Sequence, residues 1–380
     1  MNPEVYLDYC ATTPVRPEVR AAMLSTLAED FGNPSSMHWA GRRALEFITQ
    51  ARAEVAAGIG SGPDEIYFTS GATEADNLAL FGIMHQYQPG DAHLITSAVE
   101  HHAILHAVAQ LKREGYGVTI LPVDSEGRVN PQSVRQAIRH ETVLISVMLV
   151  NNETGAIQPV EEIGAIAAER GILMHTDAVQ GIGHLDVNVD NLNVHLLSLS
   201  AHKIYGPKGI GALYIREGVR MIPMAYGGFQ EKALRPGTEN VPGIVGLGAA
   251  FRFVQNHMAG ESKRQAQLRD YLIMGLKARI PQVVINGPSE KVAPHVISAS
   301  FLGSDGEMML IRLNNEGVAV SMGSACTSKS IEPSHVLTAM GLPREQIEGT
   351  LRISLGYPTT ESELDRFLEI IPAVVQRAVS

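Results

Sequence analysis

The sequence predicts an α/β protein in which a large domain, built on a mostly parallel seven-stranded sheet, is joined to a smaller C-terminal α+β domain. Short apolar runs alternate with helical stretches over the first two thirds of the chain, and repeated β-α units of this kind build parallel sheets. One run, residues 143–150, is almost wholly apolar, as expected of a strand covered on both faces. After about residue 254 the pattern changes to a polar helical stretch and shorter strands.

The individual elements follow from these patterns in chain order. In the large domain we predict strands at residues 65–69, 93–96, 118–121, 143–150, 172–176, 196–199 and 212–215. Helices are predicted there at residues 16–27, 42–57, 75–85 and 163–170. In the smaller domain we predict a helix at 261–279, strands at 296–301 and 318–320, and a closing helix at 362–377. With 380 residues, 45% of them hydrophobic, the chain is long enough for more than one domain.

Composition and charge exclude several classes of protein. The net charge is −10, from 30 Lys and Arg against 40 Asp and Glu, so no direct nucleic-acid partner is expected. The two cysteines, Cys10 and Cys326, exclude a disulfide framework and indicate a reducing, cytoplasmic setting. The sequence has no visible signal peptide and no apolar run near the roughly 20 residues of a membrane span, so no membrane association is expected.

Two residues that follow predicted strands are candidates for cofactor chemistry. Lys203 lies in the segment SLSAHKIYGPKG, residues 198–209. A lysine shielded from water loses its proton more easily and can form a Schiff base, although a surface loop lysine is the alternative. Asp177 directly follows the strand at 172–176, and ligands of open α/β sheets bind beyond the carboxyl ends of the strands. It suits the protonated ring nitrogen of pyridoxal phosphate, and a helix N-cap is the alternative.

Two further segments leave alternatives open. Residues 69–74, which read TSGATE, lie between a strand and a helix. They suit either a phosphate at the helix N-terminus or an ordinary capping box. His102 and His106 are four residues apart, which fits a weak metal pair, an imidazole stacked on a flat cofactor, or a helix-start histidine with no function.

The two cysteines have different surroundings in the sequence. Cys326 lies in the segment SMGSACTS, residues 321–328, which is typical of an exposed loop in which a thiolate is nucleophilic. Cys10 follows Asp8 and Tyr9 near the N-terminus, and we expect it to be packed and inert.

Taken together, these segments resemble the cysteine desulfurases, a class V branch of the fold type I pyridoxal phosphate-dependent enzymes. The motifs that carry the resemblance are ATTP (11–14), FGNPSS (31–36), TSGATE (69–74), VNNETG (150–155), HK (202–203), RPGTEN (235–240) and SACTS (324–328). They run in the family's order over nearly the whole chain, and the segment after Cys326 is similar to the NifS/IscS-like group. Ala201 stands where the family usually has Gly, and Cys10 where Ser or Asn is common.

The resemblance implies a fold type I large domain at residues 15–255 that binds pyridoxal 5'-phosphate. It implies a small domain, formed by residues 1–14 and 256–380, that carries the cysteine loop. Lys203 would bind the cofactor covalently, Cys326 would take the sulfur, and His101 would stack on the ring as a third catalytic group. The remaining implied residues are Asp177 at the ring nitrogen, Gln180 at the phenolic oxygen, Ala72, Thr73, Ser200 and His202 at the phosphate, Thr238 at the neighbouring subunit's phosphate, and Asn152 and Arg352 at the substrate carboxylate.

The implied reaction converts L-cysteine to L-alanine in a homodimer and passes the sulfur on as a persulfide. The implied acceptor is an iron–sulfur scaffold protein or another sulfur acceptor, as in tRNA thiolation or nitrogenase maturation. No intrinsic metal is expected, although transient ligation of an iron–sulfur cluster by Cys326 is part of the resemblance. The alternatives are a selenocysteine lyase, another class V enzyme such as an aminotransferase, and a non-catalytic scaffold for sulfur transfer.

Overall fold

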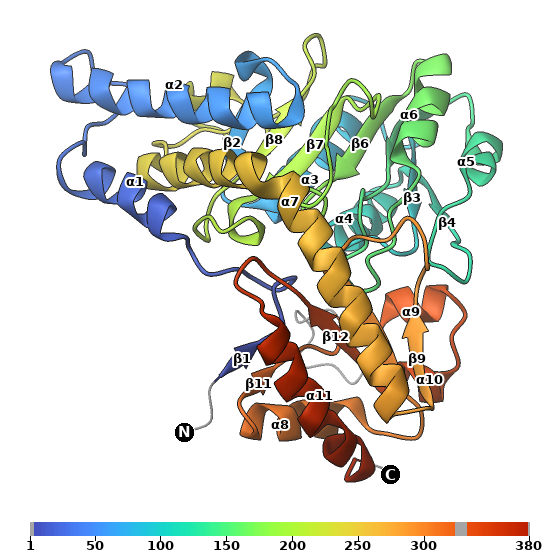
Figure 1. The fold of residues 1–380 in the computed structure, drawn as a ribbon. Helices are drawn as coiled ribbons and strands as arrows, with labels where there is room; N and C mark the ends of the chain where they lie inside the picture. The colour runs from blue at the N-terminus through green and yellow to red at the C-terminus, as the bar shows by residue number, and fades with distance from the viewer. Residues whose placement is uncertain (1–3, 324–332, 379–380) are drawn as a thin grey trace.

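The computed structural model describes residues 4–323 and 333–378 and contains the predicted seven-stranded sheet (Figure 1). The strands lie in the order β2-β8-β7-β6-β5-β3-β4. Only β8 runs against its neighbours, so the prediction of a mostly parallel sheet is confirmed. The strands are β2 (Ile66–Thr69), β3 (His93–Ser97), β4 (Gly117–Leu121), β5 (Thr142–Ser146), β6 (Leu173–Asp177), β7 (Leu196–Ser200) and β8 (Gly211–Ile215).

Helices cover both faces of this sheet. The covering helices are α1 (Pro17–Ala28), α2 (Trp39–Ile59), α3 (Ala72–Met84), α4 (His102–Arg113), α5 (Pro131–Ala137), α6 (Val160–Glu169) and the first half of α7 (Val241–Arg279). Successive strand residues point to opposite cores: Leu94 packs with α3 and α4, whereas Ile95 packs in the core that includes α2, α6 and α7. This burial on both faces explains the apolar character of the central strands.

A second core lies around a three-stranded antiparallel sheet in the order β12-β10-β9. Val5 and Leu7 belong to this core, so the N-terminus packs with the C-terminal third of the chain. In Figure 1 the first strand accordingly lies among the C-terminal elements. The elements of this region are β1 (Val5–Tyr6), β9 (Val283–Asn286), β10 (Val296–Phe301), α8 (Gly306–Asn315), β11 (Val318–Ala319), α9 (His335–Ala339), α10 (Arg344–Glu348), β12 (Thr350–Ser354) and α11 (Glu361–Gln376).

The helix α7 begins 20 residues before the start that the sequence predicts. Its first half is rich in glycine and apolar residues and is buried, so it has no polar face to mark it as helical. Its 39 residues join the two cores, since Phe251 packs in the first and Leu272 in the second. The predicted boundary at 255/256 lies inside this helix, and the division into two domains stays a prediction.

The strand predicted at 143–150 ends earlier, as β5 at Ser146. The chain beyond it still runs beside β6, because the Leu149 N–H donates to the Asp177 carbonyl oxygen at 2.8 Å. It then reverses, and Val150 pairs with Ile157 across a tight turn. This turn places Asn152 at the carboxyl edge of the sheet.

Burial of the second half of α7 gives a stability prediction. Leu272 is fully buried and Met274, two residues on, is 65% exposed. We expect Leu272→Ala to lower the free energy of unfolding by about 2–5 kcal/mol, because it leaves a cavity in the second core. Met274→Ala is the matched control and should change it by less than about 0.5 kcal/mol. Urea unfolding checks both, and equal effects would contradict this account of the second core.

Candidate active site

The candidate site begins with the N-terminal strap, which we define as residues 8–13. This strap crosses the carboxyl edge of the seven-stranded sheet and reaches the 3₁₀ turn η2 (Ala201–Lys203). The Lys203 amine donates to the backbone oxygens of Cys10 and of Ala11, the latter at 2.8 Å. The Thr13 N–H donates to the His202 carbonyl oxygen at 2.9 Å. The strap therefore fixes where the lysine amine lies.

Burial lowers the pKa of Lys203 from its ordinary value, and the positive charge of Arg352 acts in the same direction. The ionised forms of Cys10, Asp8 and Asp177 act in the opposite direction on this pKa. A lysine whose pKa is lowered holds more of its amine in the neutral form, which is the nucleophile and base of Schiff-base chemistry.

Asp177 is the last residue of β6 and is buried. Its Oδ1 accepts from the Val179 N–H at 3.0 Å in a turn, and no helix begins there, so the alternative of a helix N-cap is wrong. Burial raises its pKa to about 6, although the Val179 N–H and the Lys203 charge both favour the ionised form. A carboxylate has two oxygens, so accepting the Val179 N–H and pairing with a cofactor nitrogen are compatible.

Two predicted histidines lie on the same edge. His101 is the N-cap of α4, and its Nδ1 accepts from the Ala103 N–H at 3.2 Å. His202 Nδ1 lies 3.2 Å from the Thr12 hydroxyl. Burial, followed by the charge of Lys203, lowers the pKa of each histidine to about 4. Both imidazoles are therefore neutral at physiological pH, and a neutral ring packs on an aromatic cofactor without the cost of a buried charge.

The N-terminus of α3 offers a place for the phosphate group of pyridoxal phosphate. No side chain caps this helix, so the predicted capping box is absent there and its first N–H groups are left for an anion. A side chain added at Gly71 would meet nothing within 4 Å, which shows open space beside these groups. Ala72 and Thr73 begin the helix, and Ser200 ends the neighbouring β7. An anion cradle, a buried acid and a half-buried lysine at one edge fit the cofactor.

Arg352 approaches the strap from β12. Its Nη2 lies 2.9 Å from Asp8 Oδ1, and its Nη1 donates to the Asn152 carbonyl oxygen at 3.1 Å. The side chain is 3% exposed, and its Nε is buried without a hydrogen-bond partner. Among the described residues, two of the five guanidinium N–H groups are thus engaged, and the Nε N–H has no acceptor.

Two predicted residues, Thr238 and Cys326, remain to be placed. Thr238 is exposed, in a segment that an Arg235–Glu74 ion pair of 2.9 Å ties to the start of α3. Cys326 lies outside the described residues, so its place is untested. Cys10 is buried, as predicted.

Several groups at the site were not predicted to act there. Asp8 is the ion-pair partner of Arg352, and the backbone oxygen of Cys10 accepts from both Lys203 and Gln180. A carbonyl acceptor leaves no signal in a sequence. Glu100 is fully buried beside the site, and burial raises its pKa to about 8. Its position directly before His101 is the one signal that could have found it.

Two kinds of feature are absent from the described ranges 4–323 and 333–378. No helix there is both long and apolar enough to cross a membrane. The same ranges contain no group of three His, Cys, Asp or Glu side chains arranged for a metal ion.

Comparison with known proteins places this geometry in a family. The model for aminotransferase class-V matches residues 5–367 of the chain. The chain belongs to the class V aminotransferases. It is 50% identical to the cysteine desulfurase IscS of Methanosarcina thermophila over 99% of this chain and 93% of that protein. It is 48% identical to the enzyme of the same name from Dictyoglomus turgidum, over 99% and 96%.

Solved structures agree with this assignment. A NifS-like protein superposes with a TM-score of 0.93 at 37% identity, covering 99% of this chain and all of that one. A structure of SspA in complex with cysteine superposes with a TM-score of 0.82 at 38% identity, covering 92% and 98%. Within the class V aminotransferases the chain is therefore a member of the cysteine desulfurase group, whose cofactor is pyridoxal phosphate. The predicted family, fold type and cofactor are confirmed.

The raised pKa of Asp177 predicts how stability depends on pH in this class V enzyme. Its pKa rises from 3.8 in the unfolded chain to about 6 in the folded one, so the ionised form costs stability above pH 6. We expect Asp177→Asn, in protein stripped of cofactor, to be more stable than wild type at pH 8 by up to about 3 kcal/mol. This difference should shrink as the pH falls from 6 to 4. Urea unfolding at several pH values measures it, and an Asn variant less stable at every pH would contradict the assignment.

Proposed function

We propose that this chain converts L-cysteine to L-alanine and holds the released sulfur as a persulfide on Cys326. A cytoplasmic acceptor then takes the sulfur, either an iron–sulfur scaffold protein or the machinery of tRNA thiolation. The observation that carries the proposal is the Lys203 amine, which is held by the strap with a lowered pKa beside Asp177. The relatives named cysteine desulfurase and the SspA complex with cysteine support this substrate.

The residues at the sheet edge would hold the cofactor. The start of α3 suits its phosphate, together with Ser200 and His202; Asp177 suits its ring nitrogen, and His101 suits its ring face. When bound, pyridoxal phosphate supplies an electron sink that stabilises negative charge on the substrate Cα.

Arg352 and Asn152 would hold the substrate carboxylate. Arg352 is permanently charged and buried, with Nε free of protein acceptors, and a carboxylate is the acceptor that its planar fork suits best. Asp8 already holds one arm of the guanidinium at 2.9 Å, which sets the plane of the fork before substrate arrives.

Lys203 would carry the proton that leaves the substrate Cα, because its neutral amine is a base within the same buried site. The Cys326 thiolate would then attack the substrate sulfur. A sulfur–sulfur bond forms while the carbon–sulfur bond of the substrate breaks. L-cysteine and the Cys326 thiol thus become L-alanine and the Cys326 persulfide, with no external oxidant or reductant.

Cys10 is an unsuitable sulfur carrier. Its side chain is 2% exposed, and burial raises the pKa of its thiol despite the nearby charges of Arg352 and Lys203. Its N–H donates to the Ser354 hydroxyl at 2.9 Å, which holds it within the strap. A buried thiol with a raised pKa forms little thiolate.

Assembly as a homodimer is part of the proposal. Thr238 is exposed on a segment anchored by Arg235, so its hydroxyl is available to the phosphate site of a neighbouring subunit. No intrinsic metal is proposed, and transient ligation of an iron–sulfur cluster by Cys326 would occur only during transfer.

The sulfur carrier can be identified by mass spectrometry after incubation with L-cysteine under non-reducing conditions. We expect one added sulfur on the peptide that contains Cys326. Cys326→Ala should abolish alanine formation, while Cys10→Ala, the matched control, should change turnover by well under about tenfold. Added sulfur on the Cys10 peptide alone would refute the proposed carrier.

The cofactor lysine can be identified by borohydride reduction of the purified yellow protein followed by peptide mapping. The adduct should lie on Lys203, because its buried amine has the lowered pKa that Schiff-base formation needs. Lys203→Ala should lose the covalent adduct, whereas Lys208→Ala, a nearby exposed lysine, should keep it. An adduct on any other lysine would exclude the proposed role.

A further inference from the structure

Two histidines, the half-buried His184 and the buried His295, stack against each other behind the strap. The rings of His184 and His295 lie 3.5 Å apart between centroids, with an interplanar angle of 12°. His184 follows β6 in the large sheet region, and His295 directly precedes β10 in the three-stranded sheet. The stack therefore joins the two parts of the molecule at the level of the candidate site.

His295 also contacts Gln180, the residue expected at the cofactor's phenolic oxygen. His295 Nε2 lies 3.3 Å from Gln180 Oε1, and Gln180 Nε2 donates to the Cys10 carbonyl oxygen at 3.1 Å. Gln180 Oε1 can only accept, so His295 must carry its hydrogen on Nε2. The Gln180 amide nitrogen has two hydrogens, of which the Cys10 oxygen takes one. In the described part of the chain the second hydrogen has no acceptor, so it is left for a bound ligand.

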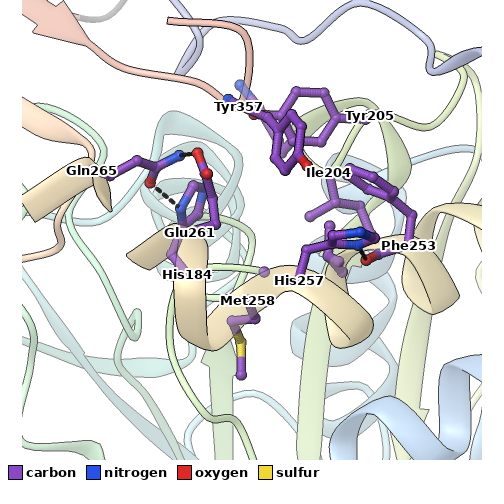
Figure 2. Close-up of a pocket in the computed structure, with 12 residues that line it drawn as sticks. His184, Ile204, Tyr205, Phe253, His257, Met258, Glu261, Gln265 and Tyr357 are labelled. Carbon is purple, nitrogen blue, oxygen red and sulfur yellow. Dashed lines mark hydrogen bonds between the residues drawn. The ribbon is translucent and has the colours of Figure 1, made fainter. Parts of the chain in front are cut away.

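On the other side of the stack, residues of α7 hold the His184 ring by hydrogen bonds. Gln265 Nε2 donates to Glu261 Oε1 at 2.8 Å, so Gln265 Oε1 accepts from His184 Nδ1 at 3.1 Å (Figure 2). These residues line a cavity of about 10 Å³ that Lys203 also lines, with room for about one water molecule. Each hydrogen bond in this chain thus has one donor and one acceptor: His184 donates to Gln265, and Gln265 donates to Glu261.

Both rings are neutral. Burial lowers the pKa of His184 to about 4, and burial followed by the neighbouring His184 lowers that of His295 well below its ordinary value. The charges of Arg352 and Lys203 act on His295 in the same direction. His295 Nδ1 is buried without a partner, so the neutral ring carries its one N–H at Nε2 and donates it to Gln180.

We propose that His295 is a positioning residue of this enzyme: stacked on His184, it holds the Gln180 amide so that one N–H is directed at the phenolic oxygen of the cofactor. The inference rests on the proposed function for the role of Gln180. His295 belongs to the region of the three-stranded sheet. Through the stack, the position of that sheet therefore affects the hydrogen bond that Gln180 makes to the phenolic oxygen of the cofactor.

A double-mutant cycle on the holoenzyme tests the proposal. His295→Phe keeps a stacked ring but has no N–H donor, and Gln180→Met keeps the chain length but has no amide. We expect His295→Phe to shift the pH midpoint of the visible absorbance by about 0.4–1 unit, because a hydrogen bond to the cofactor is lost or misdirected. On the Gln180→Met background the same substitution should cause no further shift, since it acts through Gln180.

Two variants guard against a purely structural effect. His93→Phe is the matched control, because His93 is fully buried in β3 and its ring nitrogens contact Thr142 and Thr119. It should leave the midpoint unchanged even if the protein is less stable. His295→Asn retains an N–H donor and should return the midpoint toward wild type. It also replaces His295→Phe in the cycle if the Phe variant does not fold.

The outcomes separate this inference from the proposed function. An unshifted midpoint in His295→Phe, or an equal shift on the Gln180→Met background, would overturn the positioning role. A wild-type protein without a visible cofactor band, or without alanine formation from L-cysteine, would instead overturn the proposed function.

Discussion

The Lys203 amine can be removed from water because two backbone oxygens of the N-terminal strap accept its hydrogens. An unpaired ammonium in this position would carry a desolvation cost of several kcal/mol. The carbonyls of Cys10 and Ala11 offset part of that cost without adding a full negative charge, so burial still lowers the pKa. The place of the strap therefore governs both the position and the reactivity of the lysine.

The strap is in turn held from both sheet regions. Thr13 and Thr12 contact His202 at the large sheet, whereas Asp8 pairs with Arg352 on β12. Gln180 donates to the same Cys10 oxygen that receives Lys203. A movement of one sheet relative to the other would thus displace the Lys203 amine, the Arg352 guanidinium and the Gln180 amide together. This shared dependence explains why the site needs residues from nearly the whole chain.

The sequence predicts the large sheet well because its strands are buried on both faces and are therefore rich in apolar residues. It misses the first half of α7, where residues such as Phe251 are buried on all sides, and β12, which carries Arg352. Lys203 and Asp177 stand out because each follows a strand, and the family motifs add their roles. The carbonyl of Cys10 and the stack of His184 on His295 leave no local trace, because only the tertiary fold brings their partners together.

The ion pair between Asp8 and Arg352 joins residues 344 positions apart. During synthesis from the N-terminus, at about 5–20 residues per second, the arginine is added roughly 20–70 s after the aspartate. The large sheet can form within that time, but the strap has no anchor on β12 until Arg352 has been added. The lysine amine therefore reaches its final setting only after β12 has been added, and a nascent chain that stops before Arg352 lacks this anchor of the strap.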